Sequence, residues 1–141
     1  MMDSMLTPVL LIAAVVVVMG VPVLRARLAN LPHVAPAALQ ERLAQGEDML
    51  VLDVRTPEEF AGGHIQGAVN VPVDRMPETL AGLKAGFGEH RNEPVVVVCQ
   101  RGPRAVRAAA MLKGAGLTNV ALLSGGMNAW SAAGLAVRTG A

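Results

Sequence analysis

The sequence predicts an α/β domain in three layers, with a mostly parallel central sheet flanked by helices and one transmembrane helix before it. From residue 34 onward, short apolar runs alternate with segments of helical pattern. Parallel strands need crossover connections, usually helices, so this alternation indicates a parallel sheet that is covered on both faces. Apolar residues make up 52% of the chain and charged residues 16%, and the apolar excess lies at the N-terminus. That excess predicts a separate N-terminal segment.

The N-terminal segment has the length of a membrane span. Residues 8–24 carry no charged side chain. A helix over residues 6–24 rises about 28 Å at 1.5 Å per residue, close to the bilayer's hydrocarbon thickness of about 30 Å. Arg25 and Arg27 follow it, so the positive-inside rule predicts a single-pass membrane protein with its N-terminus outside and the domain in the cytoplasm. A cleaved signal peptide would need basic residues where only Asp3 is charged, and a buried core helix would show a polar face.

Three parts are therefore expected along the chain. A total of 141 residues suffices for one domain with its own core. The predicted parts are an anchor with its flanks over residues 1–28, a linker over 29–33 and the α/β domain over 34–138.

The domain is predicted to begin with a helix and a buried strand. Over residues 35–45, Leu39 and Leu43 are four positions apart, which places them on one face of a helix. Gly46 ends this helix, because glycine is favoured just beyond a helical C-terminus. Residues 49–54 form a short apolar run, as expected of a strand covered on both faces.

A helix start follows this strand. Thr56 is placed as the N-cap, Pro57 as the first helical residue and Glu59 three positions after the cap, which is a capping box. Gly62 and Gly63 end the helix. The remaining predicted strands cover residues 68–71, 95–98 and 120–123, and the remaining helices cover 77–84, 104–113 and 127–133.

The only cysteine stands where such folds bind ligands. Cys99 directly follows the strand over 95–98, and ligands of open α/β sheets bind outside the carboxyl ends of the strands. The helix after the loop presents unpaired N–H groups and a partial positive charge, which favour a thiolate. Arg101 and Arg104 add full positive charges. We therefore predict an enzyme with Cys99 as its nucleophile.

Composition excludes several other classes of function. A net charge of +1 gives no electrostatic support for nucleic-acid binding. The single cysteine excludes an intrachain disulfide. The sequence also lacks the repeated Cys/His pattern that would indicate a metal site. No metal, no cofactor and no nucleic-acid partner are expected. A free reactive thiol fits a reducing compartment best.

Separate motifs, in a fixed order, resemble the rhodanese family. Residues 52–60 and 63–72 resemble the first half of a rhodanese domain, and residues 99–105 resemble its active-site loop. Residues 125–130 and 133–137 resemble its closing segment. The resemblance implies a rhodanese-like three-layer fold.

The resemblance to the rhodanese family also implies that the chain is a sulfurtransferase. Rhodaneses take a sulfane sulfur from a donor such as thiosulfate, carry it as a cysteine persulfide and pass it to a thiol or cyanide. On this chain the resemblance makes Cys99 the nucleophile. It implies that the donor and the persulfide are bound by the loop that follows, namely Gln100, Arg101, Gly102, Pro103, Arg104 and Ala105. The expected partners are a small-molecule donor and acceptor, and the membrane through residues 6–24; no protein partner is indicated.

Other functions stay open at this point. Cysteine-dependent phosphatases use a C-x5-R loop, whereas the spacing from Cys99 to Arg104 is C-x4-R. One residue fewer makes a smaller cradle, suited to a single sulfur atom rather than a phosphate ester. Arsenate reduction through the same type of loop is a further alternative. So is a non-catalytic, membrane-tethered module that docks a partner through this pocket.

Asp53 and Arg55 are expected to support the site, and separate contacts are expected for Arg104 and His64. We predict that Asp53 accepts hydrogen bonds near it and that Arg55 pairs with Glu59. Arg104 opposes the helix dipole at its position, so its charge should serve a ligand or a carboxylate. His64 is expected to bridge backbone groups.

Overall fold

The computed structural model describes residues 10, 11, 13–15, 30–83 and 86–141. The chain divides into two units, Met1–Leu31 and Pro32–Ala141. Most of the predicted membrane span, 6–24, lies outside the described residues, and its described residues are short helical pieces.

The predicted membrane anchor is corrected by the structure. Among the residues that the structure describes, no helix is long and apolar enough to cross a membrane. This finding contradicts the predicted single-pass localisation with a cytoplasmic domain, and the described residues support neither the transmembrane helix nor the membrane partnership predicted over residues 6–24. The predicted part boundaries, 1–28, 29–33 and 34–138, stay a prediction.

The second unit is built on a five-stranded sheet in the order β1-β5-β4-β2-β3. Every neighbouring pair of strands in it is parallel. This confirms the predicted α/β class and the parallel central sheet. The strands are β1 (His33–Val34), β2 (Leu50–Asp53), β3 (Val69–Asn70), β4 (Val95–Val98) and β5 (Val120–Leu123).

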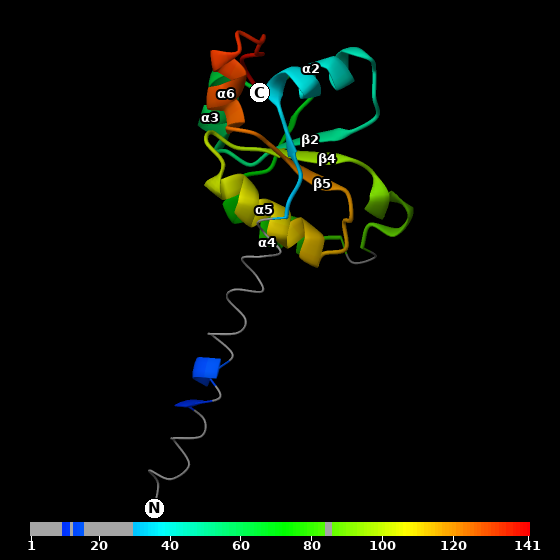
Figure 1. Cartoon of the computed structure of the whole chain (residues 1–141), viewed down its shortest axis with the longest axis vertical. Helices are drawn as coiled ribbons and strands as arrows, with labels where there is room; N and C mark the ends of the chain where they lie inside the picture. The colour runs from blue at the N-terminus through cyan, green and yellow to red at the C-terminus, as the bar shows by residue number, and fades with distance from the viewer. Residues whose placement is uncertain (1–9, 12, 16–29, 84–85) are drawn as a thin grey trace, which may run out of the picture. The chain divides into compact units, whose positions relative to one another are not determined.

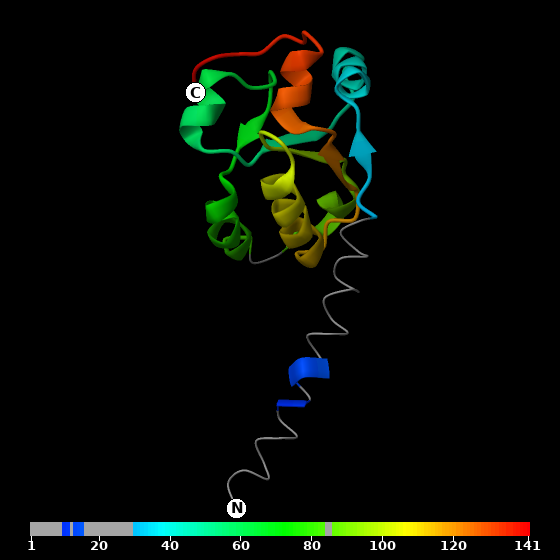
Figure 2. The same cartoon turned by 60° about the vertical axis from the view of Figure 1, so that its left-hand side comes forward.

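Helices cover both faces of this sheet, which confirms the three layers. Helices α2, α3 and α6 lie on one face and α4 and α5 on the other (Figures 1 and 2). Their bounds are α2 (Pro36–Ala44), α3 (Pro57–Gly62), α4 (Met76–Ala81), α5 (Pro103–Gly114) and α6 (Gly126–Ala132), with 3₁₀ turns η1 (Val73–Arg75) and η2 (Gly88–Asn92).

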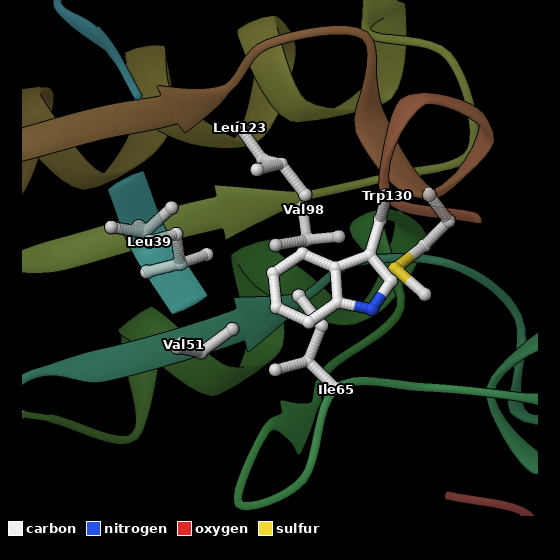
Figure 3. Packing of buried hydrophobic residues seen from close by; sticks show 8 residues of the cluster. Leu39, Val51, Ile65, Val98, Leu123 and Trp130 are labelled. Carbon is white, nitrogen blue, oxygen red and sulfur yellow. The ribbon is translucent and has the colours of Figure 1, made fainter. Parts of the chain in front are cut away.

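The core on the α2 and α6 face is centred on strand β4. Val96 and Val98 of β4 pack in one cluster with Leu39 of α2 and Trp130 of α6 (Figure 3). Side chains alternate along a strand, so the other two valines of β4 face α5, where Ala105, Ala108 and Ala109 are buried. All four residues of β4 are therefore buried. The sheet thus holds the end of β4, where Cys99 follows, in a fixed place.

Local signals predicted most elements, but not the first strand. The capping box is present, with the Glu59 amide donating to Thr56 Oγ1 at 3.2 Å and the Thr56 amide donating to Glu59 Oε1 at 3.1 Å. Strand β1, by contrast, lies at residues 33–34, of which residue 33 was predicted as linker. Two residues are too few to show a period, and only pairing with β5 makes them a strand.

Candidate active site

The site lies where β2 and β4 end side by side. Asp53, the last residue of β2, is in register with Val98, the last residue of β4. Both strands run in the same direction, so the residues that follow them emerge at the same edge of the sheet. Arg55 and Cys99 are two of these residues, although 44 positions separate them in the sequence.

The thiol lies under the loop that leads into α5. The Gly102 amide donates a hydrogen bond to Cys99 Sγ over 2.8 Å. Gly102 adopts φ 140° and ψ −43°, a backbone conformation that side chains with a Cβ rarely adopt. Cys99 is only 1% exposed. The loop therefore holds an N–H donor against a sulfur that is almost entirely covered.

A pocket of about 280 Å³ opens at this thiol. Its lining consists of Cys99, Gln100, Arg101, Pro103 and Arg104. These are five of the seven residues predicted to act on the substrate. Pro103 is the first residue of α5, a position where a helix has no use for an N–H group, so its ring stiffens the loop without removing a helical hydrogen bond.

A buried ion pair supports the pocket. Arg55 Nη2 donates to Asp53 Oδ2 over 2.8 Å and Arg55 Nε donates to Asp53 Oδ1 over 3.0 Å. The two residues are only 3% and 1% exposed. Asp53 thus accepts hydrogen bonds near the site, as predicted. The predicted partner of Arg55 was wrong, because Arg55 pairs with Asp53 and not with Glu59.

Arg55 also reaches the loop itself. Its Nη1 donates to Gln100 Oε1 over 3.1 Å, and its Nη2 donates to the Gly63 carbonyl over 2.7 Å. The Gln100 side-chain amide in turn donates to Asn128 Oδ1. Gln100 is therefore fixed between β2 and α6, and it also lines a second cavity, of about 330 Å³, beside the first.

Arg104 is held by Glu59, which lies on α3. The Arg104 Nη1 and Nη2 groups donate to Glu59 Oε1 and Oε2 over 2.6 and 2.9 Å. The guanidinium, aided by the capping contact from Thr56, lowers the pKa of Glu59 from 4.5 to about 2. Glu59 raises the pKa of Arg104 in return. The prediction that Arg104 serves a ligand or a carboxylate is confirmed for the carboxylate.

This pair makes stability depend on pH. Because the pKa of Glu59 is depressed in the folded chain, the stabilisation is present above pH 4.5 and is lost as the pH falls to about 2. The thermal unfolding temperature of the unsubstituted chain should exceed that of Glu59→Gln at neutral pH, and the gap should close through this window. Glutamine keeps the capping box. The matched control is Glu58→Gln, an exposed neighbour, for which a much smaller gap is expected; equal gaps would contradict the account.

His64 bridges backbone groups, as predicted. Its Nδ1 lies 2.7 Å from the Phe60 carbonyl oxygen, which accepts the hydrogen bond, and its ring stacks on that of Phe60 with centroids 3.7 Å apart. Its own backbone exchanges two 2.8 Å hydrogen bonds with Arg138. His64 thus ties α3 to the C-terminal segment and lies outside the thiol pocket's lining.

Helix α6 supports the thiol loop, a role that the sequence motifs did not predict. The Met127 amide donates to the Cys99 carbonyl over 2.8 Å, and the Asn128 amide donates to the Gln100 carbonyl over 3.0 Å. Gly126, the first residue of α6, lies so close that an added Cβ would be 2.4 Å from the Cys99 carbonyl oxygen. The paired glycines at 125 and 126 can be seen in the sequence, but the carbonyl groups of Cys99 and Gln100 that Gly126 approaches are distant in sequence.

The fold and this site define a cysteine-centred α/β protein whose thiol lies at the carboxyl end of a parallel sheet. The sequence model of the rhodanese-like domain matches residues 35–133. The chain therefore belongs to the rhodanese-like domain family.

Similar proteins include several sulfurtransferases. Thiosulfate sulfurtransferase 16, a chloroplastic protein of Arabidopsis thaliana, is 41% identical over 92 residues, which is 60% of this chain and 75% of that protein. A sulfurtransferase of Allochromatium vinosum is 35% identical over 100 residues, covering 71% of this chain and 88% of that one. The structure of a human single-domain sulfurtransferase superposes with a TM-score of 0.61 at 29% identity, covering 72% of this chain and 96% of its own.

Proposed function

We propose that this chain is a sulfurtransferase that carries a sulfane sulfur as a persulfide of Cys99. One observation carries the proposal: the covered Cys99 thiol receives a backbone N–H from Gly102 at 2.8 Å, and Cys99 lines a pocket together with the residues of its own loop. An N–H donor to sulfur stabilises the thiolate, which is the nucleophilic form. The sulfurtransferases among the similar proteins support the same chemistry.

The reaction has two displacement steps. The Cys99 thiolate attacks the outer sulfur of thiosulfate, a new S–S bond forms, and the old S–S bond breaks with its electron pair leaving on sulfite. A thiolate or cyanide then attacks the outer sulfur of the persulfide. That sulfur leaves with the acceptor, and the electron pair of the S–S bond returns to Cys99 as thiolate. Neither step needs an external oxidant or reductant.

The loop after Cys99 and the residues that support it bind the donor in this scheme. The backbone of Gln100 to Ala105, which has an N–H group at every position except Pro103, binds the anionic donor and the persulfide, since N–H groups of a tight loop and the start of a helix attract anions. Arg101 is exposed at the pocket and supplies positive charge toward thiosulfate. Asp53 and Arg55 hold the loop from behind through Gln100.

The geometry weighs against a phosphatase. A phosphatase arginine must turn inward and clamp the phosphate with two hydrogen bonds. Arg104 instead donates hydrogen bonds from two guanidinium N–H groups to Glu59. The shorter C-x4-R loop argues in the same direction.

Steady-state turnover tests the proposal. The chain should convert thiosulfate and cyanide to sulfite and thiocyanate in equal amounts, with many turnovers for each protein molecule. The absence of turnover with thiosulfate and with other sulfane donors, in a folded sample, would favour the non-catalytic binding module instead.

A further inference from the structure

Helix α6 determines the direction of the first two peptide groups after the thiol. Its Met127 and Asn128 amides bind the carbonyl oxygens of Cys99 and Gln100 over 2.8 and 3.0 Å. Both amides lie in the first turn of α6, where a helix has no internal acceptor for them. The two loop carbonyls therefore satisfy the helix, and the helix holds the two carbonyls.

Peptide geometry gives this contact a consequence on the other side of the loop. The described residues contain no cis peptide bond, and in a trans peptide group the C=O and N–H bonds point in opposite directions. The Cys99 carbonyl shares its peptide group with the Gln100 amide, and the Gln100 carbonyl shares its own with the Arg101 amide. With the carbonyls turned toward α6, these two amides therefore point away from the helix that holds the carbonyls. No residue of that helix lines the thiol pocket, which is lined by the loop and the start of α5.

The approach of α6 depends on a missing side chain. A Cβ built on Gly126 would lie 2.4 Å from the Cys99 carbonyl oxygen and 2.7 Å from the Gln100 carbonyl oxygen. Both contacts are with backbone atoms of the site, which cannot move aside without turning the same two peptide groups. Gly126 also has φ +60°, which glycine adopts without strain.

We propose that Gly126 is a positioning residue for sulfur transfer: by letting α6 bind the Cys99 and Gln100 carbonyls, it directs the Gln100 and Arg101 amides toward the sulfur. Together with the Gly102 amide, these N–H groups stabilise the thiolate before transfer and the negative charge on sulfur during it. The proposal rests on the proposed function for its catalytic part. Its effect on the thiolate stands without it.

Two pairs of variants test the proposal. Gly126→Ala should reduce turnover on the order of a hundredfold, the loss typical for a misplaced oxyanion donor. It should also move the pH profile of Cys99 alkylation by iodoacetamide to higher pH. The matched control is Gly125→Ala: Gly125 also has positive φ, but its Cβ would meet the Ala129 side chain at 2.6 Å rather than the loop. A much smaller effect on both readouts is expected there.

The second pair keeps the test valid if Gly126→Ala does not fold. Asn128→Pro removes the amide that binds the Gln100 carbonyl, and in the first turn it removes no helical hydrogen bond. Asn128→Ala keeps this amide and loses only the side chain. The proline variant should shift the alkylation profile further than the alanine variant.

Fluorescence of Trp130, the only tryptophan, shows whether α6 is packed in each variant. Folded Gly126→Ala or Asn128→Pro with the alkylation profile of the unsubstituted chain would overturn the proposal. Alkylation needs no sulfur donor, so this result is distinct from a failure of sulfur transfer itself.

Discussion

Substitution of Cys99 by serine is expected to lower thiosulfate-to-cyanide turnover at least about a thousandfold, because the hydroxyl cannot form the persulfide on which both steps depend. The side chain is small and buried against the loop, and serine has nearly the same shape. The fold should therefore survive. Thiocyanate formation measures the activity, and thermal unfolding shows that the variant is folded.

One result would contradict this expectation. A folded Cys99→Ser chain that keeps a tenth or more of the turnover would show that sulfur moves by another route. Serine retaining the same donor binding with no turnover would agree with the account, since the cradle is built from backbone N–H groups. Arg107→Ala, a substitution of an exposed side chain 3.7 Å from Asp74, serves as the control and should leave turnover unchanged.

Loss of Arg55 is expected to have the largest effect on stability. Arg55→Met leaves Asp53, which is 1% exposed, as a buried charge without its partner. Such a break typically costs about 3–5 kcal/mol of unfolding free energy. Denaturant unfolding at neutral pH measures it. The Gln100 side chain also loses its donor, so turnover of the remaining folded protein should fall as well.

An exposed pair of the same chemistry provides the control. Arg42 binds Glu47 through two hydrogen bonds, with about a third of each side chain exposed. Arg42→Met should change stability far less, because exposed pairs contribute little. The double substitution Asp53→Leu with Arg55→Met should recover part of the loss, since it removes both buried charges. If Arg55→Met and Arg42→Met destabilise equally, the supporting role of the buried pair is wrong.

Local patterns predicted the parts of the fold that local chemistry determines. The strands over 95–98 and 120–123 are observed with the predicted bounds, because uninterrupted apolar runs leave few alternatives. The capping box at Thr56 and Glu59 is observed because both of its hydrogen bonds lie within four residues. The position of Cys99 at a strand end follows from the same signals.

These local patterns could not predict contacts between segments that are distant in the sequence. Arg55 was predicted to pair with Glu59, four positions later, but that spacing brings side chains together only within one helix, and Arg55 precedes α3. Glu59 instead binds Arg104, 45 positions away. The approach of Gly126 to the Cys99 carbonyl is likewise a contact between residues that are far apart in the sequence. Each of these contacts needs the sheet to assemble first.

The most direct test of the account is the mass of the protein after incubation with thiosulfate and removal of small molecules. We predict that the intact chain gains one sulfur atom and that cyanide removes it, restoring the original mass. Cys99→Ser should gain nothing under the same conditions. An unchanged mass of the intact, folded chain across a panel of sulfane donors, or a gain of sulfur by Cys99→Ser, would contradict a sulfurtransferase that works through Cys99.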